Sequence, residues 1–423
     1  MPEQNLDTQE YALRLGKAAK DAALLLAAAP SGKKDAALRK AAAALRNSAG
    51  FLAAENARDI DVGRREGLSK PLLDRLELTP RRIEEMAAGL EQVSSLVDPV
   101  GEIIKGWRRP NGLLIQKVRV PIGVILIIYE SRPNVTADAA ALTLKSGNAC
   151  ILRGGKEARN SNIAIASVLS KAVESEGLPP AAIQVVEAPE HSFVTRLLKM
   201  PEYIDLVVPR GGKSLIKAVV EESRIPVIKH YEGICHTFVD AAADIPMAID
   251  ICFNAKVQRP AICNAMETML VHEAVAAQFL PEMCRRFEAA GVQLRGDAAA
   301  RALWPGMKAA TEEDWSTEYL DLILSIKIVK DVAEAIRHIR RYGSAHSDAI
   351  VSRDWNSIQA FVNEVDSSAV FVNTSTRFND GAQFGLGAEI GISTDKLHAR
   401  GPMALEELTS YKYVVYGAGQ LRQ

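Results

Sequence analysis

Short apolar segments alternate with helical segments through the middle of the chain, from Pro121 onward. Five segments are mostly Val, Ile and Leu without polar alternation: 124–128, 149–152, 183–186, 204–208 and 225–228. We expect helices between them at 136–145, 160–176, 191–199 and 212–222. Strands that are apolar on both faces are typical of a parallel sheet covered by helices on each side. The pattern therefore predicts an α/β fold.

A second alternating block begins near Gly233, with strands expected at 267–271, 322–329, 348–352 and 369–372. A chain of 423 residues exceeds what one hydrophobic core normally covers, so two or three domains are expected. We place the first domain at 1–107 with 119–232 and the second at 233–404. A small β element is expected at 108–118 with 405–423.

The first 100 residues are rich in Ala, Leu, Arg and Glu at helical spacing, which predicts three or four helices. Thr79 and Pro80 mark the start of one of them, as a cap and a first-turn proline.

Two segments predict a separate antiparallel element. Asn111-Gly112 is a hairpin signal, and residues 113–120 after it alternate in polarity. The tail at 411–416 also has a period of two and no helix after it. We expect it to pair with the hairpin and to support a homo-oligomer, at least a dimer, by sheet extension.

Charge and cysteine usage exclude several classes of protein. The net charge is −1, which predicts no nucleic-acid or membrane-surface partner. No apolar run approaches the ~20 residues that cross a bilayer. The five cysteines form no CxxC pair and are expected to be reduced thiols in the cytoplasm. The seven histidines show no metal motif, and His346 is expected to be a hydrogen-bonding group in a loop.

The tetrapeptide Arg-Gly-Gly-Lys occurs at 153–156 and again at 210–213, each time between a strand and a helix. Glycines at the carboxyl end of a parallel strand let backbone N–H groups approach a ligand, and the next helix favours anions. The pattern indicates a phosphate-rich ligand, although neither copy is a G-x-G-x-x-G or P-loop motif. Two tight turns with solvated charges are the alternative.

Cys263 lies between a loop and an apolar run, where its thiol could face a cleft. A thiolate is a strong nucleophile at neutral pH, and Lys256 or Arg259 could stabilise it if the fold brings either close. The alternative is a small buried apolar residue.

The chain resembles the aldehyde dehydrogenase superfamily from about residue 10 to residue 416, and most closely its branch that reduces L-glutamyl 5-phosphate in proline synthesis. The resemblance rests on these segments: Val120–Val124, Tyr129–Val135, Lys145–Asn148, Gln258–Asn264, Ala335–Ile339, Tyr342–Asp348 and Leu397–Pro402. It implies two Rossmann-like parallel-sheet domains, an NADPH-binding domain followed by a catalytic domain, with a small β oligomerisation element.

The resemblance also implies a reaction. Cys263 would attack L-glutamyl 5-phosphate, phosphate would leave, and hydride from NADPH would reduce the thioester to L-glutamate 5-semialdehyde. The backbone N–H of Cys263 with Asn134 or Asn264 would stabilise the oxyanion. Arg132, Arg259 and Arg377 would bind the substrate's anionic groups.

The expected cofactor-binding residues are Arg153, Gly154, Gly155, Lys156, Gly211, Gly212 and Glu318. Lys156 stands where relatives that prefer NAD carry a carboxylate for the ribose 2′-hydroxyl, so it implies a 2′-phosphate and hence NADPH. Glu318 would hold the nicotinamide ribose.

His230 falls at the position of the water-activating glutamate of hydrolytic relatives, which implies a thioester resolved by hydride. Transient contact with a glutamate 5-kinase is left open. Three alternative functions are also compatible with the sequence. They are an acylating dehydrogenase for an acyl-CoA or another acyl phosphate, a cysteine amidase or protease, and a catalytically silent nucleotide-binding module.

Overall fold

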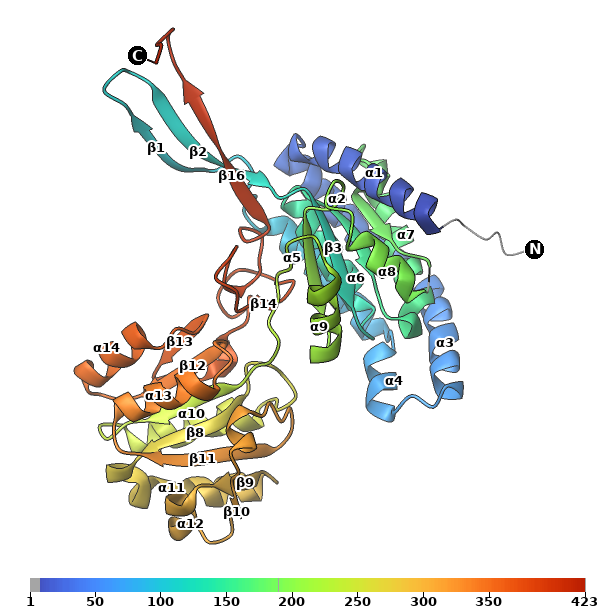
Figure 1. The fold of residues 1–423 in the computed structure, drawn as a ribbon. Helices are drawn as coiled ribbons and strands as arrows, with labels where there is room; N and C mark the ends of the chain where they lie inside the picture. The colour runs from blue at the N-terminus through green and yellow to red at the C-terminus, as the bar shows by residue number, and fades with distance from the viewer. Residues whose placement is uncertain (1–7, 189, 423) are drawn as a thin grey trace. The chain divides into compact units, whose positions relative to one another are not determined.

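The computed structural model describes residues 8–188 and 190–422, which form two compact units (Figure 1). The first unit contains the described residues up to Lys229, together with 385–391 and the segment from Met403 onward. The second contains 230–384 and 392–402. Within the described ranges, no helix combines the length and the apolar composition needed to cross a membrane.

The first unit is built on a parallel sheet of four strands in the order β5-β4-β3-β6. Every residue of the central strand β3 is buried, because helices cover both faces of the sheet. The strands are β3 (Val124–Tyr129), β4 (Ala149–Arg153), β5 (Ile183–Val185) and β6 (Leu206–Arg210). The α-helices are α1 (Thr8–Ala27), α2 (Ser31–Asn47), α3 (Ala49–Arg65), α4 (Lys70–Leu76), α5 (Pro80–Ser95), α6 (Asn134–Lys145), α7 (Arg159–Ser175), α8 (His191–Leu197) and α9 (Lys213–Glu222). Short 3-10 helices are η1 (Lys156–Ala158) and η2 (Pro180–Ala182).

A three-stranded antiparallel sheet belongs to the same unit, in the order β1-β2-β16. It consists of β1 (Ile103–Arg108), β2 (Leu114–Pro121) and β16 (Thr409–Tyr416). The tail strand pairs with β2 along its full length, from Thr409 opposite Pro121 to Tyr416 opposite Leu114. The expected pairing of tail and hairpin is therefore confirmed.

The second unit has a seven-stranded parallel sheet in the order β10-β9-β11-β8-β7-β12-β13. Helices α10 and α11 pack on one face and α13 and α14 on the other, each side enclosing a hydrophobic core. The strands are β7 (Cys235–Val239), β8 (Met266–His272), β9 (Gln293–Gly296), β10 (Lys308–Ala309), β11 (Ile323–Val329), β12 (Ser347–Val351) and β13 (Ala369–Val372). The helices are α10 (Ile245–Val257), α11 (Glu273–Ala289), α12 (Ala298–Leu303), α13 (Val332–Tyr342), α14 (Trp355–Glu364), η3 (Glu313–Ser316) and η4 (Thr376–Phe378). A separate two-stranded sheet pairs β14 (Ile392–Ser393) with β15 (Gly401–Pro402).

The predicted fold class is confirmed, with differences in detail. The strand expected at 225–228 is wrong, since only an isolated bridge joins Val227 to Val207. Pro226 lacks the N–H group that a full strand would need there. Between residues 8 and 100 the structure has five α-helices, not three or four, and Thr79 caps α5 as expected, accepting from Arg82 N.

The boundaries also differ slightly from those expected. The second unit begins at His230 rather than at 233. The hairpin begins at Ile103, five residues before the expected 108, because β1 extends further toward the N-terminus.

Candidate active site

Cys263 lies in the loop between α10 and β8, directly before a central strand of the second unit. Its side chain is half-buried, whereas the other four cysteines are buried. A nucleophilic thiol must be reachable by its substrate, so Cys263 is the cysteine suited to that role.

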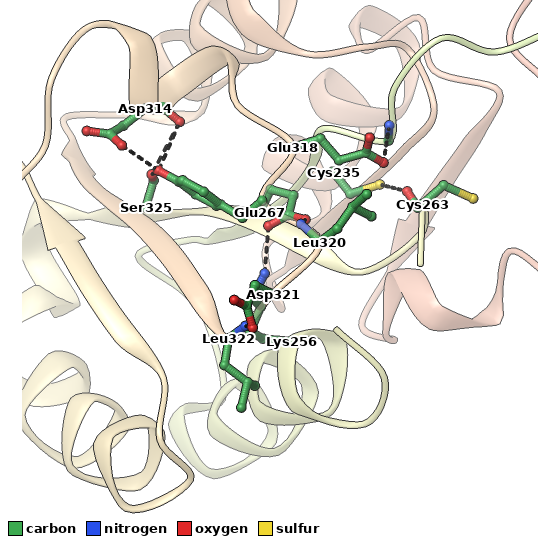
Figure 2. A network of polar contacts seen from close by, with 12 residues as sticks. Cys235, Lys256, Cys263, Glu267, Asp314, Glu318, Leu320, Asp321, Leu322 and Ser325 are labelled. Carbon is green, nitrogen blue, oxygen red and sulfur yellow. Dashed lines mark hydrogen bonds and ion pairs between the residues drawn. The ribbon is translucent and has the colours of Figure 1, made fainter. Parts of the chain in front are cut away.

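Three further segments reach the same amino-terminal edge of this sheet, each ahead of a strand close to β8. Glu318 precedes β11, residues 233–235 lead into β7, and His346 precedes β12. Figure 2 shows Glu318 and Cys235 beside Cys263. Because the strands are parallel, segments distant in sequence meet around the thiol.

Hydrogen bonds and close packing hold the segment at 232–235 against the cysteine loop. Glu318 Oε1 accepts from Gly233 N at 2.8 Å, and Ser344 Oγ accepts from Ile234 N at 2.8 Å. A Cβ on Gly233 would overlap the backbone of Cys263. Only glycine allows the two backbones to approach this closely.

The thiol of Cys235 supports Cys263 through its main chain. Cys235 Sγ donates to the carbonyl oxygen of Cys263 at 3.2 Å. Burial raises the pKa of Cys235 well above its usual range, so this thiol stays protonated and keeps donating. Cys235 therefore acts as a structural donor.

Lys256, one of the cations expected to favour the thiolate, is instead paired with Glu267. Lys256 Nζ and Glu267 Oε2 are 2.6 Å apart and both side chains are fully buried. Burial raises the pKa of Glu267 to about 7 and lowers that of Lys256. The charge of Lys256 is thus balanced by Glu267 rather than by Cys263.

Two arginines lie near the cysteine loop. Arg377 Nε donates to Gln258 Oε1 at 2.9 Å. Burial lowers the pKa of Arg377, repulsion from Arg259 lowers it further, and a charge on Cys263 would raise it. A guanidinium group is a cation that donates up to five hydrogen bonds, so this side of the loop is suited to an anionic ligand.

Asn264, the residue after Cys263, is held by hydrogen bonds to the segment at 376–379. Its amide donates to the Asn379 carbonyl at 2.9 Å, and its side-chain oxygen accepts from Arg377 Nη1. Its carbonyl accepts from Thr376 Oγ1 at 2.8 Å. These contacts fix η4 to the cysteine loop and engage both ends of the amide that was considered for the oxyanion.

Two histidines complete the surroundings of Cys263. His230 Nδ1 lies 2.9 Å from the carbonyl oxygen of Ile392. His346 is fully buried, and burial, with a smaller repulsion from His230, lowers its pKa to about 3. It is therefore neutral at physiological pH, and its loop position agrees with the hydrogen-bonding role expected for it.

In the first unit, the two Arg-Gly-Gly-Lys turns follow β4 and β6, which flank β3. Arg153 aligns with Ile128 of β3 and Arg210 with Tyr129, so both turns lie at the carboxyl edge of one sheet. A small hollow beside the first turn is lined by 153–156, Arg159, Asn162 and 185–188. This placement agrees with a ligand at the strand ends.

The two turns differ in electrostatics. At the first, Lys156 is exposed and pairs with Glu66 at 3.4 Å, leaving it accessible to solvent. At the second, the Glu130 carboxylate accepts from Gly212 N at 3.2 Å. The N–H of Gly212 already donates to a carboxylate and is not available to a phosphate. The first turn is therefore better suited to a phosphate.

Asn134 and Arg132 also belong to the first unit, and both are exposed. Asn134 begins α6, where its amide donates to Asp138 Oδ2 at 3.0 Å. Burial raises the pKa of Asp138 to about 6, which Asn134 partly offsets.

Several residues of the site were not identified from the sequence. Gly233, Cys235, Glu267 and Arg159 carry no motif of their own. The sequence feature that could have indicated this segment is Gly233, followed by Cys235 at the start of the strand 235–239. Arg159 could have been found as a third cation after the first Arg-Gly-Gly-Lys turn.

Comparison with known proteins gives a consistent result. A model of the aldehyde dehydrogenase family matches residues 3–302. The chain is 53% identical to the gamma-glutamyl phosphate reductase of Thermodesulfovibrio yellowstonii over 418 residues, covering 99% of this chain and 100% of the relative. It is 55% identical to that of Geotalea daltonii over 405 residues, covering 96% and 97%.

Solved structures show the same likeness. The crystal structure of gamma-glutamyl phosphate reductase from Thermotoga maritima superposes with a TM-score of 0.96 at 46% identity, covering 97% of this chain and 100% of that one. An acetylating aldehyde dehydrogenase from Geobacillus thermoglucosidasius, at 18% identity and a TM-score of 0.69, covers 100% of both chains and shares the fold.

Proposed function

The chain belongs to the aldehyde dehydrogenase family and, within it, to the gamma-glutamyl phosphate reductases, and we propose that it reduces L-glutamyl 5-phosphate to L-glutamate 5-semialdehyde with NADPH. Phosphate is released, and the reaction is a step of proline biosynthesis. The observation that carries the proposal is the half-buried thiol of Cys263, with Arg259 and Arg377 close to its loop.

Acylation begins when the Cys263 thiolate attacks the acyl carbon. The sulfur–carbon bond forms, the carbon–oxygen bond to phosphate breaks, and a thioester results. An acyl phosphate is already activated, so the protein has only to position the carbon and stabilise the oxyanion. We assign the backbone N–H of Cys263 to that oxygen, and the family resemblance implies a side-chain amide, that of Asn134 or of Asn264, as the second donor.

Arginines hold the two anionic groups of the substrate. Arg259 and Arg377 adjoin the cysteine loop, and Arg132 is exposed ahead of α6. A guanidinium group binds a carboxylate or a phosphate through two parallel hydrogen bonds.

When bound, NADPH supplies the hydride that reduces the thioester carbon. The carbon–sulfur bond of the resulting thiohemiacetal then breaks, which gives the aldehyde and restores the thiolate of Cys263. His230 stands where hydrolytic relatives place a glutamate base, and its Nδ1 is held by the Ile392 carbonyl. This arrangement supports transfer of hydride rather than hydrolysis.

The residues of the first turn fit a cofactor that carries a 2′-phosphate. Lys156 is exposed beside the hollow, and Arg159 lines it. Gly154 and Gly155 leave no space for a Cβ, which would meet Asn162 and Glu157. Glu318, which already holds Gly233 N, is the residue we assign to the nicotinamide ribose.

We also propose that copies of the chain associate through the sheet β1-β2-β16. Tyr413, Val415 and Tyr416 of the tail strand are exposed there. A deletion of residues after Leu408 should lower the mass measured by light scattering if the tail joins copies.

The reaction run in reverse tests the proposal. Glutamate 5-semialdehyde should reduce NADP⁺ only when inorganic phosphate is present, and Cys263→Ala should abolish that signal while leaving NADPH binding nearly intact. Cys252→Ala, a buried thiol of α10, is the matched control. Activity near that of the native protein in Cys263→Ala, or no dependence on phosphate, would refute it.

A further inference from the structure

Three side chains with metal-binding atoms converge at the proposed nucleophile. One ring nitrogen of His230, one of His346 and the sulfur of Cys263 all lie within 4.8 Å of one another. The two rings meet edge to face with centroids 5.3 Å apart. All three residues belong to the second unit, so the cluster is internal to it.

A hydrogen bond to the main chain sets which ring nitrogen of His230 carries a hydrogen. Its Nδ1 lies 2.9 Å from the Ile392 carbonyl, which can only accept, so Nδ1 carries the hydrogen. In the neutral ring, Nε2 then carries the lone pair. A metal-binding histidine almost always donates its other ring N–H to a carboxylate, a backbone carbonyl or water, and His230 has such a partner.

His346 can adopt the same arrangement of its ring hydrogens. Its Nδ1 lies 2.8 Å from Ser347 Oγ, a hydroxyl oxygen that can accept the Nδ1 hydrogen. Its Nε2 is buried and has no hydrogen-bond partner among the described residues. An unpaired buried polar atom is unfavourable, so a ligand that engages it is favoured.

The chemistry of the donors selects the ion. Two imidazoles and a thiolate are borderline-soft ligands that favour Zn²⁺ and similar ions over Mg²⁺ or Ca²⁺. Bonds of about 2.0–2.3 Å in a tetrahedral site place ligand atoms roughly 3.5 Å apart. The three ligand atoms already lie within 4.8 Å of one another, so a rotation of the Cys263 side chain can bring the sulfur to bonding distance.

We propose that Cys263, His230 and His346 bind a divalent ion of the zinc type, and that the bound ion blocks the enzyme. The thiol releases its proton to solvent and the sulfur donates an electron pair to the metal, without any redox change. A fourth position is left for water, as in open three-ligand sites. The inhibition rests on the proposed role of Cys263 as the nucleophile, whereas the binding does not.

Cobalt(II) is the probe for the site, because a bound thiolate gives it an intense charge-transfer band in the near ultraviolet. Metal-free full-length protein titrated with Co²⁺ should bind one equivalent with that band, and Zn²⁺ should remove it by displacement. Cys263→Ser should abolish the band. His346→Gln and His230→Gln should each weaken binding by about 10-fold or more.

His272→Asn is the matched control, since that histidine caps α11 and asparagine is also a good cap. It should bind Co²⁺ like the native protein. Circular dichroism and the melting temperature show whether each variant is folded, and His346→Ala gives a second variant at the buried position.

Activity separates the two proposals. Zn²⁺ should inhibit the native reaction, and a chelator should restore it. Folded native protein that shows no charge-transfer band, or binding unaffected by both histidine changes, would overturn the metal site and leave the proposed function standing. Binding with the band but without inhibition would confirm the site and show that Cys263 is not the nucleophile.

Discussion

The Cα of Gly233 lies so close to the backbone of Cys263 that a Cβ at position 233 would stand 1.8 Å from the Cys263 carbonyl oxygen. This is a contact between two main chains, so no side-chain rotation relieves it. The proposed nucleophile is thus held in place by the segment just before β7, and the hydrogen bond from Gly233 N to Glu318 fixes the position of that segment.

Replacing Gly233 by alanine should therefore displace the thiol. We expect kcat/KM to fall about 100-fold, because displacements of ~1 Å at a reacting centre have effects of that size. Gly50→Ala is the control, since a Cβ there meets nothing within 4 Å and the position lies inside α3. Equal activity in the two variants would show that the close approach does not position Cys263.

Lys156→Glu should shift cofactor preference from NADPH toward NADH. The ratio of kcat/KM for the two cofactors should fall about 100-fold, since one charge-assisted hydrogen bond is lost and a repulsion replaces it. Stability should change little, because the Lys156–Glu66 pair is exposed. Lys217→Glu, exposed on α9, is the control, and an unchanged ratio in Lys156→Glu would remove that lysine from the cofactor site.

Asn134 and Asn264 should respond differently to alanine. Asn264 is buried and bonded to η4, so Asn264→Ala should lower the free energy of unfolding by about 2 kcal/mol. Asn134 is exposed at the start of α6, so Asn134→Ala should leave stability unchanged and lower kcat about 100-fold if its amide stabilises the oxyanion. Chemical denaturation and steady-state rates measure both. A stable Asn264→Ala with low kcat would reverse the assignment.

Much of the fold could be predicted because the apolar residues that form a pattern along the sequence are also the residues buried in the folded protein. The apolar runs of β3 and β4 are buried on both faces, and the alternating tail pairs with β2. The strand β7 was not identified because His236 and Thr237 interrupt its apolar run, although both are fully buried. His236 is accommodated there by a hydrogen bond to Asp348 at 2.9 Å.

The candidate site was less predictable, because it is assembled from segments far apart in sequence. Cys263 could be identified from the sequence around it, but its partners Gly233, Glu318 and His346 come from loops ahead of other strands. No spacing motif joins His230, Cys263 and His346, so the sequence showed no metal site. Lys256 is near Cys263 in sequence, but its salt bridge with Glu267 depends on the packing of α10 against β8.

The buried histidines predict how stability depends on pH. Burial, and then repulsion from His236, lowers the pKa of His338 to about 2, and burial lowers that of His346 to about 3. The unfolded chain binds a proton at each below about pH 6.5 while the folded chain does not. Stability is therefore fully present above that pH and falls on acidification, by about 1.4 kcal/mol per pH unit for each histidine.

His338→Phe should remove one of these two contributions. The ring packs against Trp315 and Tyr342, with centroids 5.4 and 4.7 Å away, and a phenyl group can keep both contacts. Both of its ring nitrogens lack hydrogen-bond partners among the described residues, so the change removes unpaired polar atoms. Urea unfolding between about pH 6.5 and 5 should show a slope of stability against pH that is shallower by about 1.4 kcal/mol per unit than in the native protein. An unaltered slope in His338→Phe would mean that this histidine is protonated in the folded state.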